Sequence, residues 1–197
     1  MTELPNRPTY VRDLQSILIT RPSTEGNTLH YFDYVSEHEV LAGRKTRTAL
    51  QQTGYEAVWS FKNCNPLIAR AMAFKVANAL RDIKDPKGFT FVCIPSHEDG
   101  LYHRRCDWFS ALVCRLTGMR DGTPSLHVAD AVSARLSGDE RKTPTYTTSC
   151  RELFEGREAV VFDDVITSGR TAEGFSDYLG SMGCQVKRSV FIARALP

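Results

Sequence analysis

Residues 160–171 read VVFDDVITSGRT, and this stretch decides the fold expected for the chain. It begins within an apolar run at residues 159–162, whose side chains are mostly branched or aromatic. Such a short, continuously apolar run is typical of a central parallel strand that is covered on both faces. Two carboxylates, Asp163 and Asp164, end the run. The stretch therefore predicts a buried strand with paired acidic side chains at its end.

A turn rich in hydroxyl groups follows the carboxylates and opens a helix. Its short donors and its permissive backbone come from Thr167, Ser168, Gly169 and Thr171. A helical pattern over residues 172–182 begins directly after the turn. Because free N–H groups and the helix dipole favour a phosphate there, the stretch predicts a site for a phosphorylated sugar. The alternative is that the aspartates only form a polar strand end and that the turn is an ordinary helix cap.

The order of these residue types resembles the signature with which type I phosphoribosyltransferases bind phosphoribosyl pyrophosphate (PRPP). The shared pattern is an apolar run, two acidic residues, two apolar residues, Thr-Ser-Gly, any residue and Thr. The resemblance implies that Asp163 and Asp164 are catalytic residues that hold the ribose 2′ and 3′ hydroxyls. It also implies a loop around the 5′-phosphate, whose PRPP-binding residues are Val165, Ile166, Thr167, Ser168, Gly169, Arg170 and Thr171. A long motif with most positions constrained is far more specific than a lone glycine motif.

Helical and strand patterns alternate along the chain from residue 65 onward. Asn65 is the expected N-cap of a helix over residues 65–84, and a β-rich apolar run follows at residues 89–94. A second helix is expected over residues 105–117, and a last strand over residues 185–193. This alternation predicts an α/β fold with a parallel sheet flanked by helices. The resemblance implies its type I phosphoribosyltransferase-like, Rossmann-like form.

The N-terminal part has a weaker pattern, with strands expected at residues 29–35 and 57–61. In the resembled family a small, variable hood covers the side of the site that binds the base. We therefore expect residues 1–62 to form an N-terminal hood or appendage and residues 63–197 to form the α/β core. Aromatic residues in this part could stack on a base, although alternating aromatics are more often core: Tyr31, Phe32, Tyr34, Tyr55, Trp59 and Phe61.

The loop after the strand at residues 89–94 is a second candidate site. In the resembled family this position holds a pyrophosphate-binding loop with a strained backbone. The residues expected to contact pyrophosphate are Ser96, His97, Arg104 and Arg105. The alternative is a solvated loop followed by a cluster of charges at a helix start.

Residues 133–151 are polar and lack an apolar period, which predicts a long loop. Their place before the motif strand matches the flexible catalytic loop of the resembled family, which folds over PRPP. The cations expected to reach pyrophosphate are Arg135, Arg141 and Lys142, of which the last two are predicted to be catalytic. A cation that arrives with loop closure stabilises the developing leaving-group charge. The alternative is that these loop charges are solvated.

Residues 89–197 are similar, in finer detail, to ComF-like phosphoribosyltransferases. The similarity rests on an Ile-Pro-Ser-His loop, an arginine-bearing helix start, a leucine-rich helix, a polar loop around Arg135 and Leu136, the DDVITSGRT motif and a final FIARAL strand. ComF-like proteins often begin with a zinc module built on cysteine pairs, and this chain has none. The N-terminal half therefore looks like a different attachment.

These features predict an enzyme of nucleotide metabolism, a phosphoribosyltransferase that transfers the 5-phosphoribosyl group of PRPP to an acceptor and releases pyrophosphate. A nucleobase is the default acceptor in the resembled family. The expected cofactor is Mg²⁺ bound mainly through PRPP oxygens, so no residue is predicted as a dedicated metal ligand. The alternative function is a PRPP- or nucleotide-binding regulatory protein with little or no turnover. The resemblance also admits a homodimer.

The composition of the chain argues against several other classes of protein. The net charge of the 197 residues is +2, which argues against a nucleic-acid binder driven by electrostatics. No apolar run is long enough to span a bilayer and no secretory core follows the N-terminus, so we expect a soluble, cytoplasmic protein without a membrane partner. The six cysteines are scattered without a C-x-x-C pair, and most are expected to be reduced core thiols.

Overall fold

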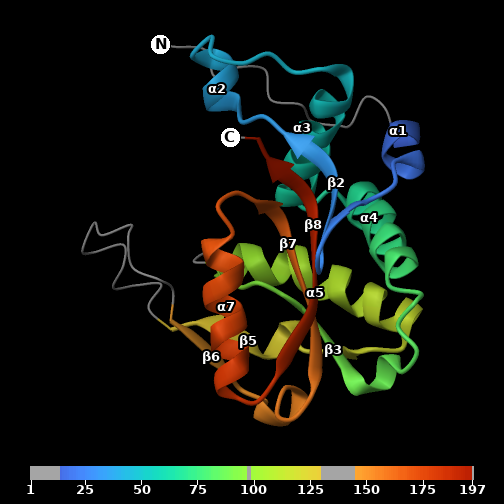
Figure 1. Ribbon diagram of the computed structural model, residues 1–197, viewed down its shortest axis with the longest axis vertical. Coiled ribbons are helices and arrows are strands. Elements are labelled where there is room, and N and C mark those ends of the chain that lie inside the picture. The colour runs from blue at the N-terminus through green and yellow to red at the C-terminus, as the bar shows by residue number, and fades with distance from the viewer. Residues whose placement is uncertain (1–13, 97–98, 130–144, 197) are drawn as a thin grey trace.

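The computed structural model describes residues 14–96, 99–129 and 145–196, and within them a six-stranded sheet forms the centre of the molecule (Figure 1). Its strand order is β1-β2-β8-β7-β3-β4. The strands are β1 (Ser23–Glu25), β2 (Thr28–Tyr34), β3 (Phe89–Cys93), β4 (Arg120–Asp121), β7 (Glu158–Ile166) and β8 (Gln185–Ala195). All neighbouring strands pair in parallel except β1 with β2. The expected α/β fold with a parallel sheet is therefore confirmed.

Helices cover both faces of this sheet (Figure 1). In the described part of the chain they are α1 (Leu14–Ile19), α2 (Glu37–Leu41), α3 (Ala49–Lys62), α4 (Pro66–Ala79), α5 (Asp99–Thr117) and α7 (Arg170–Ser181). Helices α3, α4 and α5 share one core with the sheet, which contains Phe61, Met72 and Phe109. Helix α7 packs on the opposite face through Phe175 and Leu179. Strand β7 is consequently covered on both sides, as its apolar run predicts.

The local signals of α4 and α5 act as the sequence predicts, although the bounds differ. The Asn65 side chain caps α4 by accepting hydrogen bonds from the N–H groups of Leu67 and Ile68. Helix α4 ends at Ala79, before the expected residue 84, and α5 begins at Asp99 rather than at residue 105. Gly118 follows α5 with a φ of +82°, the left-handed conformation that ends many helices.

The expected strand at residues 57–61 is wrong, because this segment lies in α3. Thr48 begins the helix with a capping box: its hydroxyl accepts from the N–H of Gln51, and the Gln51 side chain accepts from the N–H of Thr48. Val58 and Phe61, three positions apart, both lie on the buried face. The apolar residues here fit a helical period, and the cap decides in favour of the helix.

The N-terminal segment shares the sheet and the core with the rest of the chain. Strand β2, expected at residues 29–35, pairs in parallel with β8. Helix α3 approaches β2 so closely that a Cβ on Gly54 would lie 2.6 Å from the Cβ of Phe32. A hood made from residues 1–62 stays a prediction, and β2 and α3 place their buried side chains in a core common to both parts.

A two-stranded antiparallel ribbon, β5 (Leu126–Val128) with β6 (Tyr146–Thr148), adds to the core on the α7 side. Tyr146 is buried, with its ring edge-on to Phe175 at a centroid distance of 4.9 Å. The expected loop over residues 133–151 is therefore wrong for the segment that forms β6. Short 3-10 turns in the described chain are η1 (Pro86–Gly88), η2 (Thr123–Ser125) and η3 (Arg151–Leu153). The predicted loop cations Arg135, Arg141 and Lys142 lie outside the described residues.

The six cysteines are all free thiols, and Cys93, Cys106, Cys114 and Cys184 are buried, which confirms their expected core role. Among the residues described, no helix combines the length and apolar character that crossing a bilayer requires.

Candidate functional site

Strand β7 brings the two aspartates to the carboxyl end of the sheet, between β8 and β3. The strand continues to Ile166, so Val165 and Ile166, expected in the loop, still pair with β8. Because side chains alternate along a strand, Asp163 and Asp164 lie on opposite faces of the sheet. Asp163 shares the face covered by α7, and Asp164 shares the face covered by α3 and α5.

The turn at residues 167–169 joins β7 to α7. Gly169 precedes the helix with a φ of +83°, and no side chain caps the first turn of α7. The N–H groups there are therefore available to an anion, and the helix dipole favours one. The turn borders a cavity of about 20 Å³, room for roughly one water, with Asp163, Thr167 and Thr171 in its wall. Arg170 and Thr171, expected in the loop, form the first turn of α7 instead.

Asp164 is held between two cations on the face of α3 and α5. The Nζ of Lys62 lies 3.4 Å from its Oδ1, and the Nη1 of Arg105 lies 3.8 Å from its Oδ2. The side chains of Asp164 and Arg105 are only 10% and 14% exposed, whereas that of Lys62 is 44% exposed. A carboxylate this deeply buried needs such partners to offset the loss of hydration, and we expect the more buried cation, Arg105, to contribute more than Lys62.

Asp163 lies in a different environment, although the charges of Lys62 and Arg105 also act on its carboxyl and lower its pKa. Burial, followed by the charge of Asp164, raises the pKa of Asp163 to about 7. Its Oδ1 accepts a hydrogen bond from the N–H of Asp164 at 2.8 Å, which acts in the opposite direction. Within the described ranges, no lysine or arginine forms an ion pair with Asp163. This carboxyl therefore exchanges its proton near neutrality, and a cationic group that binds beside it would favour its ionised form.

The second predicted loop begins where β3 ends, and β3 pairs in parallel with β7. Ser96 is half-buried there, and His97 lies outside the described residues. The two predicted arginines separate: Arg105 reaches Asp164, whereas Arg104 is exposed on α5. The structure thus brings Arg105 to the carboxylate pair, and a pyrophosphate role for this loop stays a prediction.

Two groups, one at Asp164 and one on α5, have little or no signal in the sequence. Lys62 is the last residue of α3, a segment whose pattern was compatible with a strand, so nothing local indicates its pairing with Asp164. His103 Nδ1 lies 3.0 Å from an oxygen of Asp107, and its Nε2 lies 3.4 Å from Nδ1 of His127. The spacing of four between His103 and Asp107 is visible on a helix, but the approach of His127 from β5 is a tertiary contact.

Tyr34 is the aromatic residue best placed for contact with a ligand at this edge. It is half-buried at the end of β2, whereas Tyr31, Phe32 and Phe61 are buried in the core. Its ring stacks on that of Tyr55 at a centroid distance of 6.2 Å. Burial raises the pKa of Tyr34, and the charges of Lys62 and Asp164 also act on it, so its hydroxyl lies within their field.

No three His, Cys, Asp or Glu side chains in the described part of the chain converge on a common point, as a metal held by protein alone requires.

Comparison with known proteins supports the fold. No family model matches the sequence, and no curated protein matches it. The adenine phosphoribosyltransferase of Leishmania tarentolae matches with a TM-score of 0.50 and 11% identity, over 87% of this chain and 93% of that chain. That of Leishmania donovani matches with a TM-score of 0.50 and 10% identity, over 87% and 85%. At such identities the likeness concerns the fold alone. The chain therefore has the α/β fold of the type I phosphoribosyltransferases.

Proposed function

We propose that the chain is a phosphoribosyltransferase that binds Mg²⁺–PRPP at the carboxyl end of β7 and transfers the 5-phosphoribosyl group to a nucleobase. The observation that carries this proposal is the junction of β7 with α7. There an acidic pair is followed by an uncapped helix start at the carboxyl end of the parallel strands, where α/β folds bind their ligands. The proposal extends to the ComF-like subgroup, a cytoplasmic location and a homodimer.

The turn before α7 supplies the phosphate site in this proposal. The 5′-phosphate accepts hydrogen bonds from the N–H groups that begin α7 and from the exposed hydroxyls of Thr167 and Ser168. Gly169 adopts a positive φ in this turn, a conformation that glycine takes without a steric penalty, so we expect it to let these donors approach the phosphate. The present cavity holds about one water, so the turn opens when phosphate enters.

In this proposal both aspartates bind the ribose hydroxyls, and they differ in the charged groups that surround them. Asp164 is already charge-compensated by Lys62 and Arg105 and accepts from a ribose hydroxyl with its remaining lone pairs. Asp163 ionises on binding, and its carboxylate oxygens suit Mg²⁺, which keeps waters and prefers oxygen ligands. When bound with PRPP, Mg²⁺ supplies charge that offsets the pyrophosphate oxygens.

The transfer breaks the bond between C1′ and a pyrophosphate oxygen and forms a bond between C1′ and a ring nitrogen of the base. Pyrophosphate leaves with the electron pair, and the base loses the proton of that nitrogen to solvent. We propose that the leaving group is stabilised by Ser96, His97, Arg104, Arg141 and Lys142. Tyr34 is the candidate to stack on the base beside Lys62.

Pyrophosphate release from PRPP tests the proposal when it is measured with each common purine and pyrimidine base in turn. We expect one class of base to stimulate release well above a base-free blank. The double variant Asp163→Asn, Asp164→Asn should lose this release. Asp177→Asn, which changes an exposed carboxylate on the same α7, should retain it and serves as the matched control.

The ion pairs of Asp164 favour a second candidate, a regulatory protein that binds PRPP with little turnover. A carboxylate already occupied by two cations contributes less to a reaction that changes the charge of the sugar. Calorimetric binding of Mg²⁺–PRPP without pyrophosphate release for any base would select this candidate. Absence of binding would overturn both candidates.

A further inference from the structure

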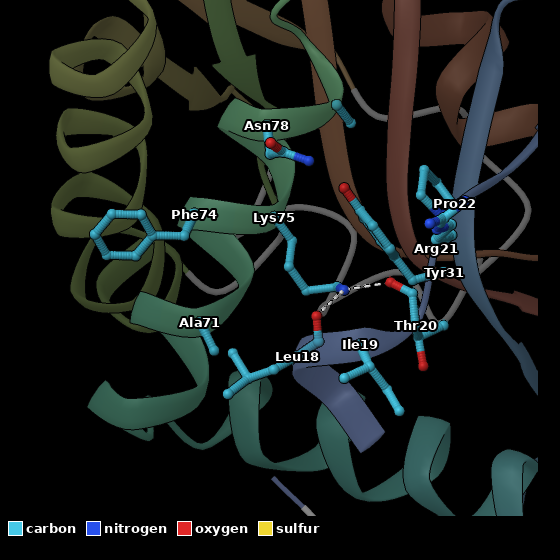
Figure 2. Close-up of a pocket in the computed structure, with 11 residues that line it drawn as sticks. Leu18, Ile19, Thr20, Arg21, Pro22, Tyr31, Ala71, Phe74, Lys75 and Asn78 are labelled. Atoms are coloured by element: carbon cyan, nitrogen blue, oxygen red, sulfur yellow. Dashed lines mark hydrogen bonds between the residues drawn. The ribbon is translucent and has the colours of Figure 1, made fainter. Parts of the chain in front are cut away.

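A second cavity of about 470 Å³ lies between α1, α4 and β2 (Figure 2). None of the residues that line it belongs to the cavity beside the β7–α7 turn. Its volume falls in the range of small-molecule sites. The proposed function assigns it no role.

Lys75 of α4 brings a positive charge into this cavity. Its ammonium donates hydrogen bonds to the carbonyl oxygens of Leu18, at 3.2 Å, and of Thr20 (Figure 2). The nitrogen also lies 4.9 Å from the ring centroid of Tyr31. An ammonium has three donors, so two carbonyls leave one for a ligand. Burial lowers the pKa of Lys75, and an anion beside it would offset that cost.

Tyr31 of β2 adds a buried polar atom that lacks a partner. The residue is 4% exposed, and its hydroxyl forms no hydrogen bond within the described part of the chain. Figure 2 shows its ring extending from β2 toward α4, with Lys75 and Asn78 on the α4 side of the ring and Pro22 and Arg21 on the other. Buried hydroxyls are almost always paired, so this one is a candidate donor to a group that enters the cavity.

The remaining wall specifies the charge and the shape of that group. The charged side chains in it are Lys75 and Arg21, and none of the lining residues is acidic. Apolar surface comes from Ile19 of α1 and Phe74 of α4, both exposed, and from Ala71. The lining therefore matches an anion that carries a flat apolar body, because one end meets cations and the other meets aliphatic and aromatic side chains.

We infer that this cavity binds a small organic carboxylate with a ring-sized apolar body. The carboxylate accepts from the Lys75 ammonium and from the Tyr31 hydroxyl, and the apolar body lies against Leu18 and Ile19. The site stands independently of the proposed function, since it shares no residue with the PRPP site.

Sodium benzoate is the probe, titrated into the full-length ¹⁵N-labelled chain at constant ionic strength while backbone amide shifts are followed. Saturable shifts are expected at residues 18–21, 31 and 71–79, and benzylamine, which has the same ring with a positive charge, should cause none. An absence of saturable shifts in these segments would overturn the site. Equal displacement of benzoate by inorganic phosphate would overturn the apolar part of the assignment.

Two variants locate the contacts. Tyr31→Phe removes only the unpaired hydroxyl, so the protein should fold at least as stably and bind benzoate about tenfold more weakly. Lys75→Met should weaken binding by at least as much, whereas Lys84→Met, at an exposed position after α4, should bind as the parent does. Unchanged affinity in Tyr31→Phe would remove the hydroxyl from the site. Tyr31→Phe and Lys75→Met should each bind Mg²⁺–PRPP as the parent does, which separates this test from that of the proposed function.

Discussion

Asp163 and Asp164 are neighbours in the sequence but occupy opposite faces of β7. Asp164 lies between Lys62 and Arg105, and its charge is compensated before any ligand arrives. Asp163 faces α7 and the small cavity beside the turn, and its pKa is raised to about 7 by burial and by its neighbour. The alternation of a strand therefore gives two identical side chains two different electrostatic states.

This difference suggests a division of labour in the proposed PRPP site. Asp164 is fixed in place by its ion pairs and acts as a constant acceptor for a ribose hydroxyl. Asp163 changes its protonation on binding and couples the site to pH. Substitutions on either face can show whether the two carboxylates act together or independently.

The largest effect is expected from Gly169→Val, on the Asp163 face. Valine strongly disfavours a φ of +83°, so the turn must rearrange and its donors no longer converge on the phosphate. Crowding is not the cause, because the nearest atom to a Cβ here is a Glu173 oxygen at 3.8 Å. Losing two or more charge-assisted hydrogen bonds should weaken ribose 5-phosphate binding by more than about 3 kcal/mol in calorimetry.

Gly180→Ala is the matched control for this change, since Gly180 is an exposed α7 glycine with nothing within 4 Å of an added Cβ. Alanine favours the helix, so stability should stay equal or rise slightly, and ribose 5-phosphate should bind normally. Normal binding by Gly169→Val itself would mean that the turn is not the phosphate site.

A large change in stability is expected from Arg105→Met on the other face. Methionine keeps an apolar stem of similar length but leaves the buried Asp164 with only Lys62, which should cost about 2–4 kcal/mol in urea unfolding. Lys62→Met removes the more exposed partner and should cost less than about 1 kcal/mol. Equal costs for the two variants would contradict the assignment of Arg105 as the principal partner.

The sequence predicts the fold well because its strongest signals are local. The apolar run at residues 159–162 forms the covered strand, Asn65 caps α4 as expected, and Gly118 ends α5 in the left-handed conformation. Where the local pattern is ambiguous, prediction fails. Apolar residues near Phe61 fit both a strand and a helix, and the capping box at Thr48 determines which one forms.

The sequence predicts only those parts of the candidate site that lie within the motif at residues 160–171. The aspartates and Gly169 lie in one motif, so their proximity follows from the chain. Lys62 joins Asp164 through the packing of α3, and no spacing in the sequence encodes that contact. Of the two adjacent arginines, only the helical phase of α5 decides that Arg105 faces Asp164 and that Arg104 faces solvent.

Replacing each aspartate by asparagine compares the two faces directly. Asp163→Asn and Asp164→Asn should each weaken PRPP binding by about 1.5–3 kcal/mol, because each loses a charged acceptor for a sugar hydroxyl. Their stabilities at about pH 8 should move in opposite directions. At this pH burial disfavours the ionised Asp163 carboxylate, so Asp163→Asn should stabilise the protein. Asp164→Asn leaves Lys62 and Arg105 without their carboxylate partner, so it should destabilise the protein. Unchanged PRPP affinity in both variants would refute the ribose assignment.

The smallest effect concerns pH and depends on Asp163 alone. Its pKa is raised on folding, so between about pH 4 and pH 7 the native state holds a proton that the unfolded chain has lost. Stability must then fall as pH rises through this window, by about 1–2 kcal/mol for a carboxyl that solvent partly reaches. Subtracting the urea-unfolding profile of Asp163→Asn from that of the parent isolates this contribution. PRPP affinity should follow the opposite course and rise through about pH 7 in the parent, because binding requires the ionised carboxylate. A profile in which Asp163→Asn shows the same pH dependence as the parent would assign the proton to another group and remove the distinction between the two faces of β7.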